Sequence, residues 1–467
     1  MPVLLNRPQP WRGASPLTGF PTRAFVTLAL AVVVSALVLP AVAHAQSLPL
    51  SVAEALSRAQ DQNYTVRLAE ADRQIARAGV HQSRAVFLPR LSVSETATAT
   101  TDPLNAFGFK LRQEVVTQAD FAPEVLNDPG RVENFGMQVQ VQQPVLNPAG
   151  LFERRAAQSR LAASTYALER TGHVIAFQVQ QAYFGLALAH RRVATLDDAL
   201  AAARVTLDQT QRFFDEGLIT RADLLAARVR LLELESQHTE ARNAVQETAD
   251  RLRYLIGLDD EVALVLTDSL EAPEQGVDAV ETERVNETRS DMQALRRQID
   301  AARQTVRARR MAFVPSLNLF GSYDWNDSAL LGTGGQGWTV GATLQWSPFQ
   351  GFEQAGALQQ ARAELKRATL VYEDQMRQNY IELEAARRSL TVARERLGLT
   401  RTAVEQAEEN LRIRADRYAQ GLEQTTDVLA AEVALANARL SYLQTLYGYA
   451  LSAFRLELLA EQPLVRR

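Results

Sequence analysis

The chain of 467 residues contains no cysteine, only five histidines and few residues that end helices. Without cysteine, an exported protein has no disulfide framework, so its stability must come from packing and assembly. Lipid attachment to an N-terminal cysteine is excluded for the same reason. The 23 glycines and 17 prolines lie mostly in a few clusters, while Ala, Leu, Arg, Glu and Gln dominate the middle of the chain. This composition is typical of long helices.

Motifs for catalysis or for a bound cofactor are also missing. The sequence holds no G-x-S-x-G motif, no phosphate-binding loop and no dinucleotide fingerprint. Beyond the N-terminal segment, His81, His173, His190 and His238 are at least 17 residues apart and show no metal-ligand spacing. We therefore predict that the protein is not an enzyme, and we expect neither a metal nor a cofactor.

The N-terminus has the features of a secretory signal peptide. Three arginines precede an apolar run from Ala24 to Leu39, and small residues mark a cleavage site after Ala45. The run is short for a membrane-spanning helix, and the alternative is an uncleaved anchor. Removing residues 1–45 takes away three basic and no acidic residues, so the net charge changes from −4 to −7. A negative chain without a basic face is not expected to bind nucleic acid.

One stretch of the sequence occurs twice. Residues 214–227 and 418–431 share an aromatic residue, a Gly-Leu pair, an aspartate and an apolar triplet at an offset of 204 residues, without a gap. Such self-similarity indicates an internal repeat. Each copy is typical of a long helix, a tight glycine turn and a helix that runs back. The predicted divisions are a signal peptide (1–45), a first repeat (46–257), a linker with a short strand or helix (258–285), a second repeat (286–461) and a tail (462–467).

Four segments alternate between apolar and polar residues, which is the period of a β-strand. They lie at residues 91–100, 135–142, 317–325 and 338–346. In a soluble protein the apolar face would pack on a core, whereas in an outer-membrane barrel it would face lipid and the polar face would line a lumen. Segments of about ten residues cross a bilayer at a tilt, which favours the barrel. Aromatic residues near the strand ends resemble interfacial girdles, namely Tyr323, Trp325, Trp338 and Trp346.

Four strands do not close a barrel, and an open edge in lipid leaves backbone groups unpaired. The chain is therefore expected to assemble with copies of itself. A trimer would give a twelve-stranded barrel, whereas a dimer would give eight strands and little lumen. The predicted fold class is an α+β membrane protein in which each chain contributes four transmembrane strands to a trimeric barrel.

Long helices are predicted for most of the remaining chain. One helix covers residues 51–87 and another covers residues 286–312, and each ends before a proline and a strand. A longer helix covers residues 151–214, which corresponds to about 95 Å. The apolar residues of its second half and of the return helix repeat at 3-4 spacing. This spacing predicts antiparallel coiled-coil packing, with His238 as a core or interface histidine on the seam.

The two F-[LV]-P-x-L junctions, the four strands and the paired [FY]-x-x-G-L…D-[VL]-L turns together resemble the TolC-like outer-membrane efflux proteins. The resemblance covers essentially all of the chain after the signal peptide. It implies a homotrimer in the outer membrane, with a twelve-stranded barrel and a long periplasmic α-barrel. It also implies a passive exit duct, for which an inner-membrane transporter supplies the energy and a periplasmic adaptor docks on the helical tips.

The resemblance also implies roles for the twin turns. Asp427 matches an acid that rings the periplasmic aperture in family members, and Asp223 matches the acid of the first turn. The chain departs from the family pattern at Ala430, where a second acid is expected, and at Glu423, where some members carry a basic residue. Three Asp427 carboxylates converging on a threefold axis would repel one another and bind cations. The adaptor-docking positions are matched by Gly217, Leu218, Gly421 and Leu422.

The same turn residues also have structural interpretations. Asp223 and Asp427 lie near helix starts, where an acid interacts favourably with the helix dipole. Thr220 and Asp223 have the spacing of a capping box. Gly217 and Gly421 suit the positive-φ position after a helix, a role that is compatible with docking.

The sequence leaves three functions to distinguish. The leading prediction is the outer-membrane exit duct of a tripartite efflux system, which conducts small molecules to the exterior. The second is the outer-membrane channel of a type I protein secretion system, because the duct sequence does not separate the two. The third is a periplasmic coiled-coil scaffold without a pore, which would be soluble after removal of the signal peptide.

Overall fold

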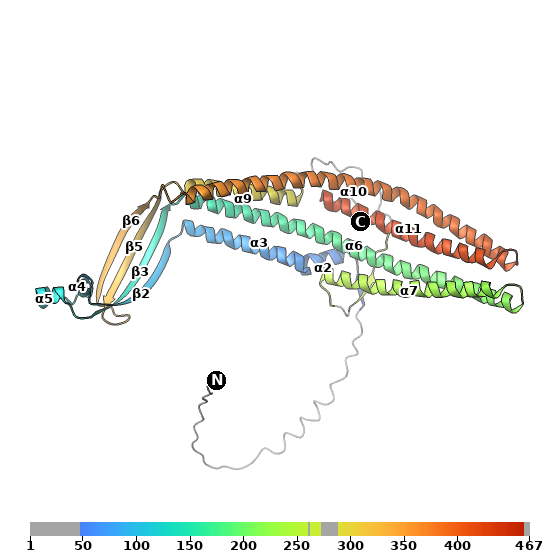
Figure 1. Cartoon of the computed structure of the whole chain (residues 1–467), viewed down its shortest axis with the longest axis horizontal. Coiled ribbons are helices and arrows are strands. Elements are labelled where there is room, and N and C mark those ends of the chain that lie inside the picture. Colours follow the sequence, from blue (N-terminus) through green and yellow to red (C-terminus); the bar gives the residue numbers. More distant parts are fainter. Residues whose placement is uncertain (1–46, 260–261, 272–287, 462–467) are drawn as a thin grey trace, which may run out of the picture. The chain divides into compact units, whose positions relative to one another are not determined.

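Strands and helices of very different lengths alternate along the chain (Figure 1). The computed structural model describes residues 47–259, 262–271 and 288–461. The expected signal peptide, the tail and part of the linker lie outside these residues. In chain order the described elements are β1 Ser47–Leu50, α2 Val52–Gln62, α3 Tyr64–Gln82, η2 Ser83–Val86, β2 Arg90–Thr100, α4 Pro103–Arg112, η3 Gln118–Phe121, α5 Pro123–Asn127, β3 Val132–Leu146, α6 Pro148–Asp215, α7 Arg221–Ile256, β4 Ala263–Leu266, α9 Ser290–Met311, β5 Ser316–Asp327, β6 Gly335–Gln345, α10 Glu353–Ala419 and α11 Thr425–Ala460.

The single helix predicted over residues 51–87 is wrong, because two helices, α2 and α3, meet at Asn63. Asn63 is extended, with φ −63° and ψ 128°, and its side-chain oxygen accepts hydrogen bonds from the N–H groups of Thr65 and Val66. Its side-chain nitrogen donates to the carbonyl oxygen of Leu255 at 2.9 Å. Asparagine is a strong N-cap. The break between α2 and α3 is therefore stabilised by Leu255, which lies 192 residues away in the sequence. The local helical pattern around Asn63 does not indicate this break.

Four antiparallel strands form one sheet in the order β2-β3-β5-β6. All four predicted strands are present, and β3 is longer than predicted. The register pairs Val139 with Tyr323 on one face and Gln138 with Asp324 on the other. Because successive residues of a strand point to opposite faces, the sheet has an apolar face and a polar face. The β3–β5 register shifts after Pro144, which places a bulge where the chain turns toward α6.

The long helices have nearly the predicted lengths. α6 and α10 contain 68 and 67 residues, and α7 and α11 contain 36 residues each. At about 1.5 Å per residue, α6 spans about 100 Å. α6 packs along α7, and α10 packs along α11. We call these antiparallel pairs hairpin 1 (α6 and α7) and hairpin 2 (α10 and α11), each with a turn at its tip (Figure 1). No helix among the described residues is long and apolar enough to cross a membrane.

The predicted 3-4 pattern of apolar residues lies between the helices of hairpin 1. Its buried cluster consists of Leu196, Leu200, Ala203, Leu234 and Ala241. The interface role predicted for His238 is confirmed, because its Nε2 lies 3.0 Å from Oδ1 of Asp197 on the opposite helix. Two of the five buried residues are alanines, Ala203 and Ala241.

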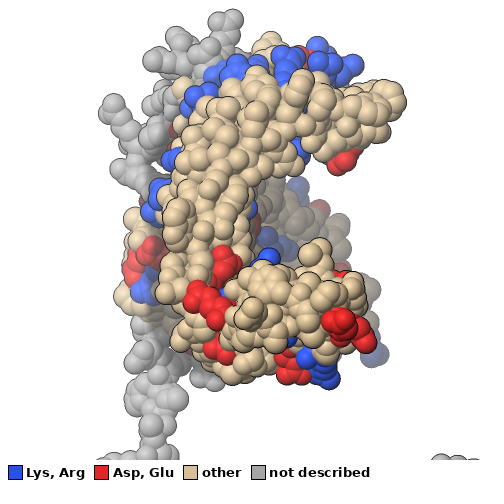
Figure 2. Space-filling model, turned by 90° about the vertical axis from the view of Figure 1, so that its left-hand side faces the viewer, with Lys and Arg blue, Asp and Glu red and all other residues tan. Residues whose placement is uncertain are grey.

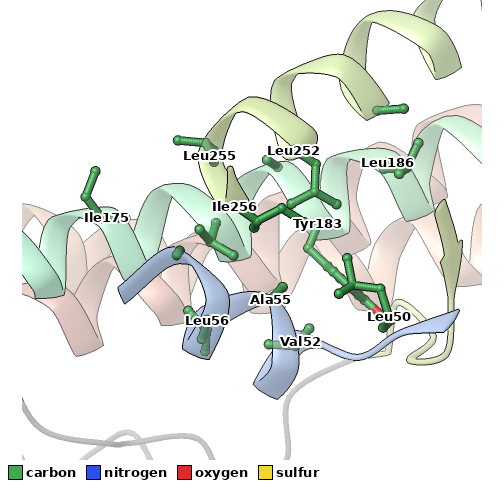
Figure 3. Close-up of a cluster of buried hydrophobic side chains, with 14 residues drawn as sticks. Leu50, Val52, Ala55, Leu56, Ile175, Tyr183, Leu186, Leu252, Leu255 and Ile256 are labelled. Atoms are coloured by element: carbon green, nitrogen blue, oxygen red, sulfur yellow. The ribbon is translucent and has the colours of Figure 1, made fainter. Parts of the chain in front are cut away.

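A second buried cluster lies where α2, α6 and α7 meet a two-stranded sheet of β1 and β4 (Figure 3). The buried hydroxyl of Tyr183 donates to the carbonyl oxygen of Leu50 at 2.8 Å and accepts from the N–H group of Asp268 at 3.1 Å. The Asp268 carboxylate accepts from the N–H group of Val52 at 2.7 Å. The linker was predicted to carry a short strand or helix, and β4 is a strand that pairs with the start of the first repeat.

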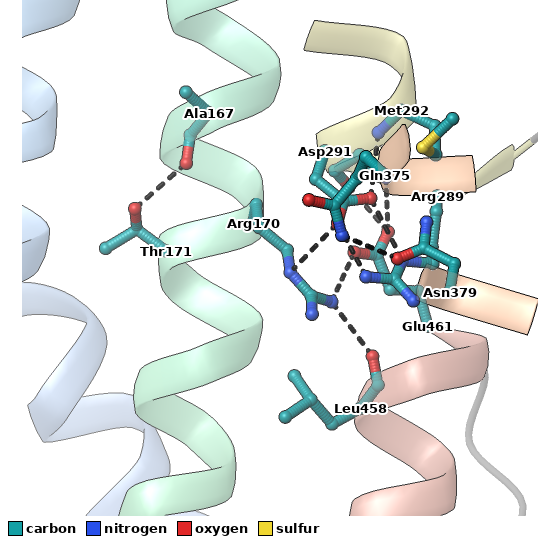
Figure 4. A network of polar contacts seen from close by, with 11 residues as sticks. Ala167, Arg170, Thr171, Arg289, Asp291, Met292, Gln375, Asn379, Leu458 and Glu461 are labelled. Carbon is teal, nitrogen blue, oxygen red and sulfur yellow. Dashed lines mark hydrogen bonds and ion pairs between the residues drawn. The ribbon is translucent and has the colours of Figure 1, made fainter. Parts of the chain in front are cut away.

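A polar cluster connects α6 with the start of α9 and the end of α11 (Figure 4). Arg170 donates to the carbonyl oxygen of Leu458 at 3.0 Å and to Glu461 at 2.9 Å. Glu461 also accepts from the N–H group of Ser290 at 2.7 Å. Arg170 thus satisfies a carbonyl group at the C-terminal end of α11, where cationic side chains are favourable. The cluster joins helices from both predicted repeats.

Candidate functional site

The two turns at the hairpin tips have the same backbone. Gly217 and Gly421 have φ values of 77° and 71°, which confirms the predicted positive-φ positions. In each turn the N–H group of the following leucine donates to a carbonyl group five residues earlier, at 2.8 Å and 2.9 Å. A Cβ atom on either glycine would meet nothing within 4 Å, so backbone conformation, not crowding, requires glycine. Leu218 and Leu422 are 67% and 63% exposed, which leaves an apolar side chain at each tip.

The first turn is closed by its own cap. The Asp223 carboxylate accepts from the N–H group of Thr220 at 3.0 Å and from its hydroxyl at 2.6 Å. The N–H group of Asp223 donates back to the Thr220 hydroxyl at 3.4 Å. This reciprocal arrangement is the capping box that the spacing predicted. The Asp223 side chain is therefore occupied by local hydrogen bonds.

The second turn is held by charges instead of a cap. Gln424, at the position equivalent to Thr220, makes no side-chain cap hydrogen bond. Glu423 pairs with Arg414 and with Arg417, both at 2.8 Å. Arg414 also lies 3.5 Å from the Asp427 carboxylate. The contacts of Arg414 were not predicted from the sequence, because Glu423 lies nine residues further along the chain, beyond the turn.

Tyr418 links the two hairpins just above the tips. Its side chain is buried, and its hydroxyl lies 3.1 Å from the hydroxyls of Thr210 on α6 and Thr425 on α11. The ring of Phe213 meets the Tyr418 ring edge-on at 5.4 Å. A cavity of about 650 Å³ lies beside this contact, and both turns line it. It brings together Leu218, Asp223 and Gly421 of the predicted site, whereas Asp427 is outside its lining.

A buried acid further along the hairpins was missed by sequence reasoning. Glu432 of α11 accepts a hydrogen bond of 2.5 Å from the Thr206 hydroxyl of α6. Burial raises the pKa of Glu432, and the Thr206 hydrogen bond and the charge of Arg230 only partly oppose this. Glu432 and Arg230 line a small cavity of about 50 Å³ among helices of both hairpins. A lone Glu among alanines and leucines has no sequence signal that would identify this cross-hairpin contact.

The apolar face of the sheet is exposed. Trp338 is 73% exposed and Val340 is 72% exposed, although such large side chains normally lie in a core. Tyr323 pairs with Trp338 across β5 and β6, and its ring lies 4.5 Å from that of Trp325. Trp346 follows β6 and donates from its indole nitrogen to the carbonyl oxygen of Phe313 at 3.1 Å. A contiguous apolar surface of this kind needs an apolar partner.

The opposite face of the sheet is polar and partly covered. Gln138 donates to the Asp324 carboxylate at 2.7 Å, and Asn134 donates to the side-chain oxygen of Asn326 at 3.0 Å. These residues line a cavity of about 560 Å³ together with Arg112 of α4. The view toward this end of the chain shows a hollow surface with charged groups gathered toward its edges (Figure 2). The short helices α4 and α5 between β2 and β3 were not indicated by the sequence.

Comparison with known proteins identifies relatives over most of the chain. A sequence model of the family described as outer membrane efflux protein matches residues 55–258 and 283–460. The alkaline protease secretion protein AprF of Pseudomonas aeruginosa is 22% identical over 398 residues, which cover 84% of this chain and 79% of AprF. The outer membrane protein OprJ of the same organism is 24% identical over 384 residues, which cover 80% of this chain and 76% of OprJ.

The fold also matches solved structures. The CmeC outer membrane channel of Campylobacter jejuni superimposes with a TM-score of 0.75, at 19% identity, over 89% of this chain and 86% of that chain. At this level of identity the match concerns the fold, in which helices predominate.

Proposed function

Because this chain belongs to the family of outer membrane efflux proteins, we propose that three copies of it form the exit duct of a tripartite efflux system. The family assignment makes the protein an efflux channel of the outer membrane. The observation that carries the proposal is a sheet with one exposed apolar face and one polar face. This sheet continues into helices about 100 Å long, which suits a barrel in the membrane and a long periplasmic extension.

The edges of the sheet argue for assembly with copies of the same chain. Among the strands that the structure describes, β2 and β6 each have a neighbour on one side only. In lipid each unpaired backbone group costs several kcal/mol, so the edges must pair. Three chains joined edge to edge give a closed barrel of twelve strands, with the apolar face toward lipid and the polar face toward the lumen. Tyr323, Trp325, Trp338 and Trp346 then lie at the lipid boundary, where aromatic residues are favourable.

The hairpin tips form the periplasmic aperture in this proposal. Three copies of Asp427 line the constriction, and Asp223 lies on the neighbouring turn of each protomer. The ion pair between Arg414 and Asp427 balances part of the negative charge that Asp427 brings to the axis. Asp223 contributes less to the aperture than Asp427 because its carboxylate is engaged by Thr220.

The tips are also the proposed docking surface for a periplasmic adaptor protein. Gly217 and Gly421 bend the chain so that Leu218 and Leu422 project from the tips. Exposed leucines at the ends of two hairpins, repeated in three protomers, offer apolar contacts to the tips of another helical protein. The inner-membrane transporter that joins the same adaptor supplies the energy, and the duct itself is passive.

A protein-secretion duct is the second candidate. The observation that favours it is the similarity to AprF, which is named for secretion of an alkaline protease. Deleting the gene for this chain distinguishes the two candidates. Greater sensitivity to small toxic molecules, with normal secretion of proteins, supports efflux. Loss of an exported protein without such sensitivity supports secretion.

Purification of the full-length protein tests the proposed function directly. The chain should fractionate with the outer membrane, run as a trimer in mild detergent and form ion-conducting channels in planar lipid bilayers. Light scattering with a detergent correction measures the number of protomers. A monomeric protein that stays soluble without detergent and conducts no ions would establish the periplasmic scaffold instead.

A further inference from the structure

The helix α4 lies across the polar face of the sheet at the end far from the long helices. β2 starts next to η2 and runs away from it, so α4, which follows β2, lies at the distal end. α4 contacts β3 and β6, which are separated in the sheet by β5. Two local interactions stabilise α4. At its start the Asp102 side chain accepts a hydrogen bond from the N–H group of Asn105 at 2.9 Å, and near its end Lys110 pairs with Asp120 at 2.7 Å. A short helix is thus held across three strands.

Gly335 of β6 provides the space in which the end of α4 rests. A Cβ atom at this glycine would lie 1.8 Å from the carbonyl oxygen of Arg112 and 2.7 Å from its carbonyl carbon. Backbone atoms cannot give way as a flexible side chain does, so any residue other than glycine would displace the end of α4. Gly337, two residues along the same strand and on the same face, would have nothing within 4 Å of a Cβ atom. The close approach to α4 therefore occurs at Gly335 and not at Gly337.

Gln113 fastens the same end of α4 to the sheet. Its side chain is only 7% exposed, and its amide nitrogen donates to the carbonyl oxygen of Glu133 at 2.8 Å and to Asn134 at 2.9 Å. Asn134 in turn donates to Asn326 on β5 at 3.0 Å. A buried amide is costly when it lacks partners, so this chain of hydrogen bonds favours one position of α4 over others.

With α4 held in this position, Arg112 and Asp324 line the same cavity. Both residues line the space of about 560 Å³ between α4 and the polar face. The Asp324 carboxylate is oriented by hydrogen bonds from Gln138 at 2.7 Å and from Ser322 at 2.9 Å. No ion pair within 4 Å joins the two charges among the residues that the structure describes. A cation and an anion thus face one polar space without neutralising each other in direct contact.

We propose that Gln113 and Gly335 seat α4 inside the distal end of the duct, where Arg112 and Asp324 form a charged constriction that selects among permeating ions and solutes. The inference rests on the proposed function, because it assumes that the polar face lines a conducting lumen. In a trimer the constriction contains three guanidinium groups and three carboxylates. Arg112 disfavours cations and Asp324 disfavours anions, so the wild-type constriction is close to balanced. This selectivity site is separated from the hairpin tips by the length of the long helices.

Two matched glycine substitutions test the seat. Single-channel conductance is measured in planar bilayers for wild type, Gly335→Ala and Gly337→Ala, after each variant is shown to be a trimer in detergent. Gly335→Ala should displace α4 and raise the conductance on the order of twofold, because a wider constriction resists ion flow less. Gly337→Ala adds a methyl group to the lining of the same cavity without contacting α4, so it should not raise the conductance. Gln113→Ala, which removes the hydrogen bonds and adds no bulk, should raise the conductance in the same direction.

Two charge substitutions test the selectivity. Arg112→Gln should shift the reversal potential in a salt gradient toward cation selectivity, and Asp324→Asn should shift it toward anion selectivity. A wild-type protein without channels would refute the proposed function itself. A conducting wild type with unchanged Gly335→Ala and Gln113→Ala variants would refute only the seat. Unchanged reversal potentials in both charge variants would refute only the selectivity assigned to Arg112 and Asp324.

Discussion

The two hairpin tips share a sequence pattern and a backbone, yet their side chains are held in different ways. In the first turn Asp223 and Thr220 satisfy each other in a capping box. In the second turn Glu423 and Asp427 are paired with arginines of the preceding helix, and no side chain caps the start of α11. The comparison shows that a repeated motif specifies the path of the chain without specifying the state of its charges.

We expect this difference to divide the roles of the tips. The Asp223 carboxylate is engaged in local hydrogen bonds, whereas Asp427 lies beside Arg414 and is proposed to interact with ions. Tyr418, next to the second turn, also contacts Thr210 of hairpin 1. Substitutions at equivalent positions of the two turns should therefore have unequal effects.

The largest expected difference concerns the aromatic residues that precede the two turns. Tyr418→Ala removes a buried ring and its hydroxyl contacts and should destabilise the tips by about 3–4 kcal/mol. Phe214→Ala, at the equivalent position of the first turn, should cost about half as much because Phe214 is only half-buried. Hydrogen–deuterium exchange of the two tips in the purified protein measures both effects. Equal exchange in the two variants would contradict the role of Tyr418 as a link between hairpins.

The next difference concerns the two aspartates. Asp427→Ala should raise the single-channel conductance and weaken block by divalent cations about tenfold, which corresponds to about 1.4 kcal/mol. Asp223→Ala should leave the cation block nearly unchanged, because its carboxylate is occupied by Thr220. Titration of the block with a divalent cation compares the variants. If the two variants behave alike, the assignment of the constriction to Asp427 fails.

A smaller effect is expected at the buried contact between the hairpins. Burial raises the pKa of Glu432 above its ordinary value of 4.5, so the folded protein binds this proton more tightly than the unfolded chain. Its contribution to stability is then complete below the unfolded pKa and is lost as the pH rises through the raised folded pKa. Glu432→Gln keeps the acceptor for Thr206 and should be more stable than wild type at neutral pH, by about 1 kcal/mol, but not in acid.

Thermal unfolding at several pH values checks this expectation. Glu405→Gln, on the exposed surface of α10, serves as the matched control and should show no pH-dependent difference. A Glu432→Gln variant that is less stable than wild type at neutral pH would indicate that the attraction to Arg230 outweighs burial.

The smallest expected effects concern the caps. Thr220→Ala should destabilise the first tip by about 1 kcal/mol because it removes the capping box. Gln424→Ser should stabilise the second tip by about 0.5 kcal/mol, because it would pair with Asp427 three residues later as Thr220 does with Asp223. Local hydrogen exchange at the start of α7 and α11 measures both. A destabilising Gln424→Ser would show that the arginine pairs of the second turn exclude a cap.

Much of the architecture follows from local patterns in the sequence. The alternation of residues along the strands and the unbroken helical stretch after Pro148 predict the sheet and α6, since side-chain period and the absence of helix breakers are local properties. The glycine turns and the Thr220–Asp223 box are predicted equally well, because each depends on residues within one turn of helix. Asn63 shows the limit, since its local surroundings look helical while its partner Leu255 is distant.

The tertiary structure alone decided which side chains act together. Gln113 forms a hydrogen bond with Asn134, Glu432 with Thr206 and Tyr418 with Thr210. The members of each pair are separated in the sequence by distances that neither the helical nor the strand period predicts. The sequence by itself determined the four strands of the large sheet, the long helices, the two faces of the sheet and the path of both turns, because sterics and hydrogen bonding over a few residues control these. The unequal charges of the tips and the seat of α4 on Gly335 depend on packing between distant segments, so only the folded chain specifies them.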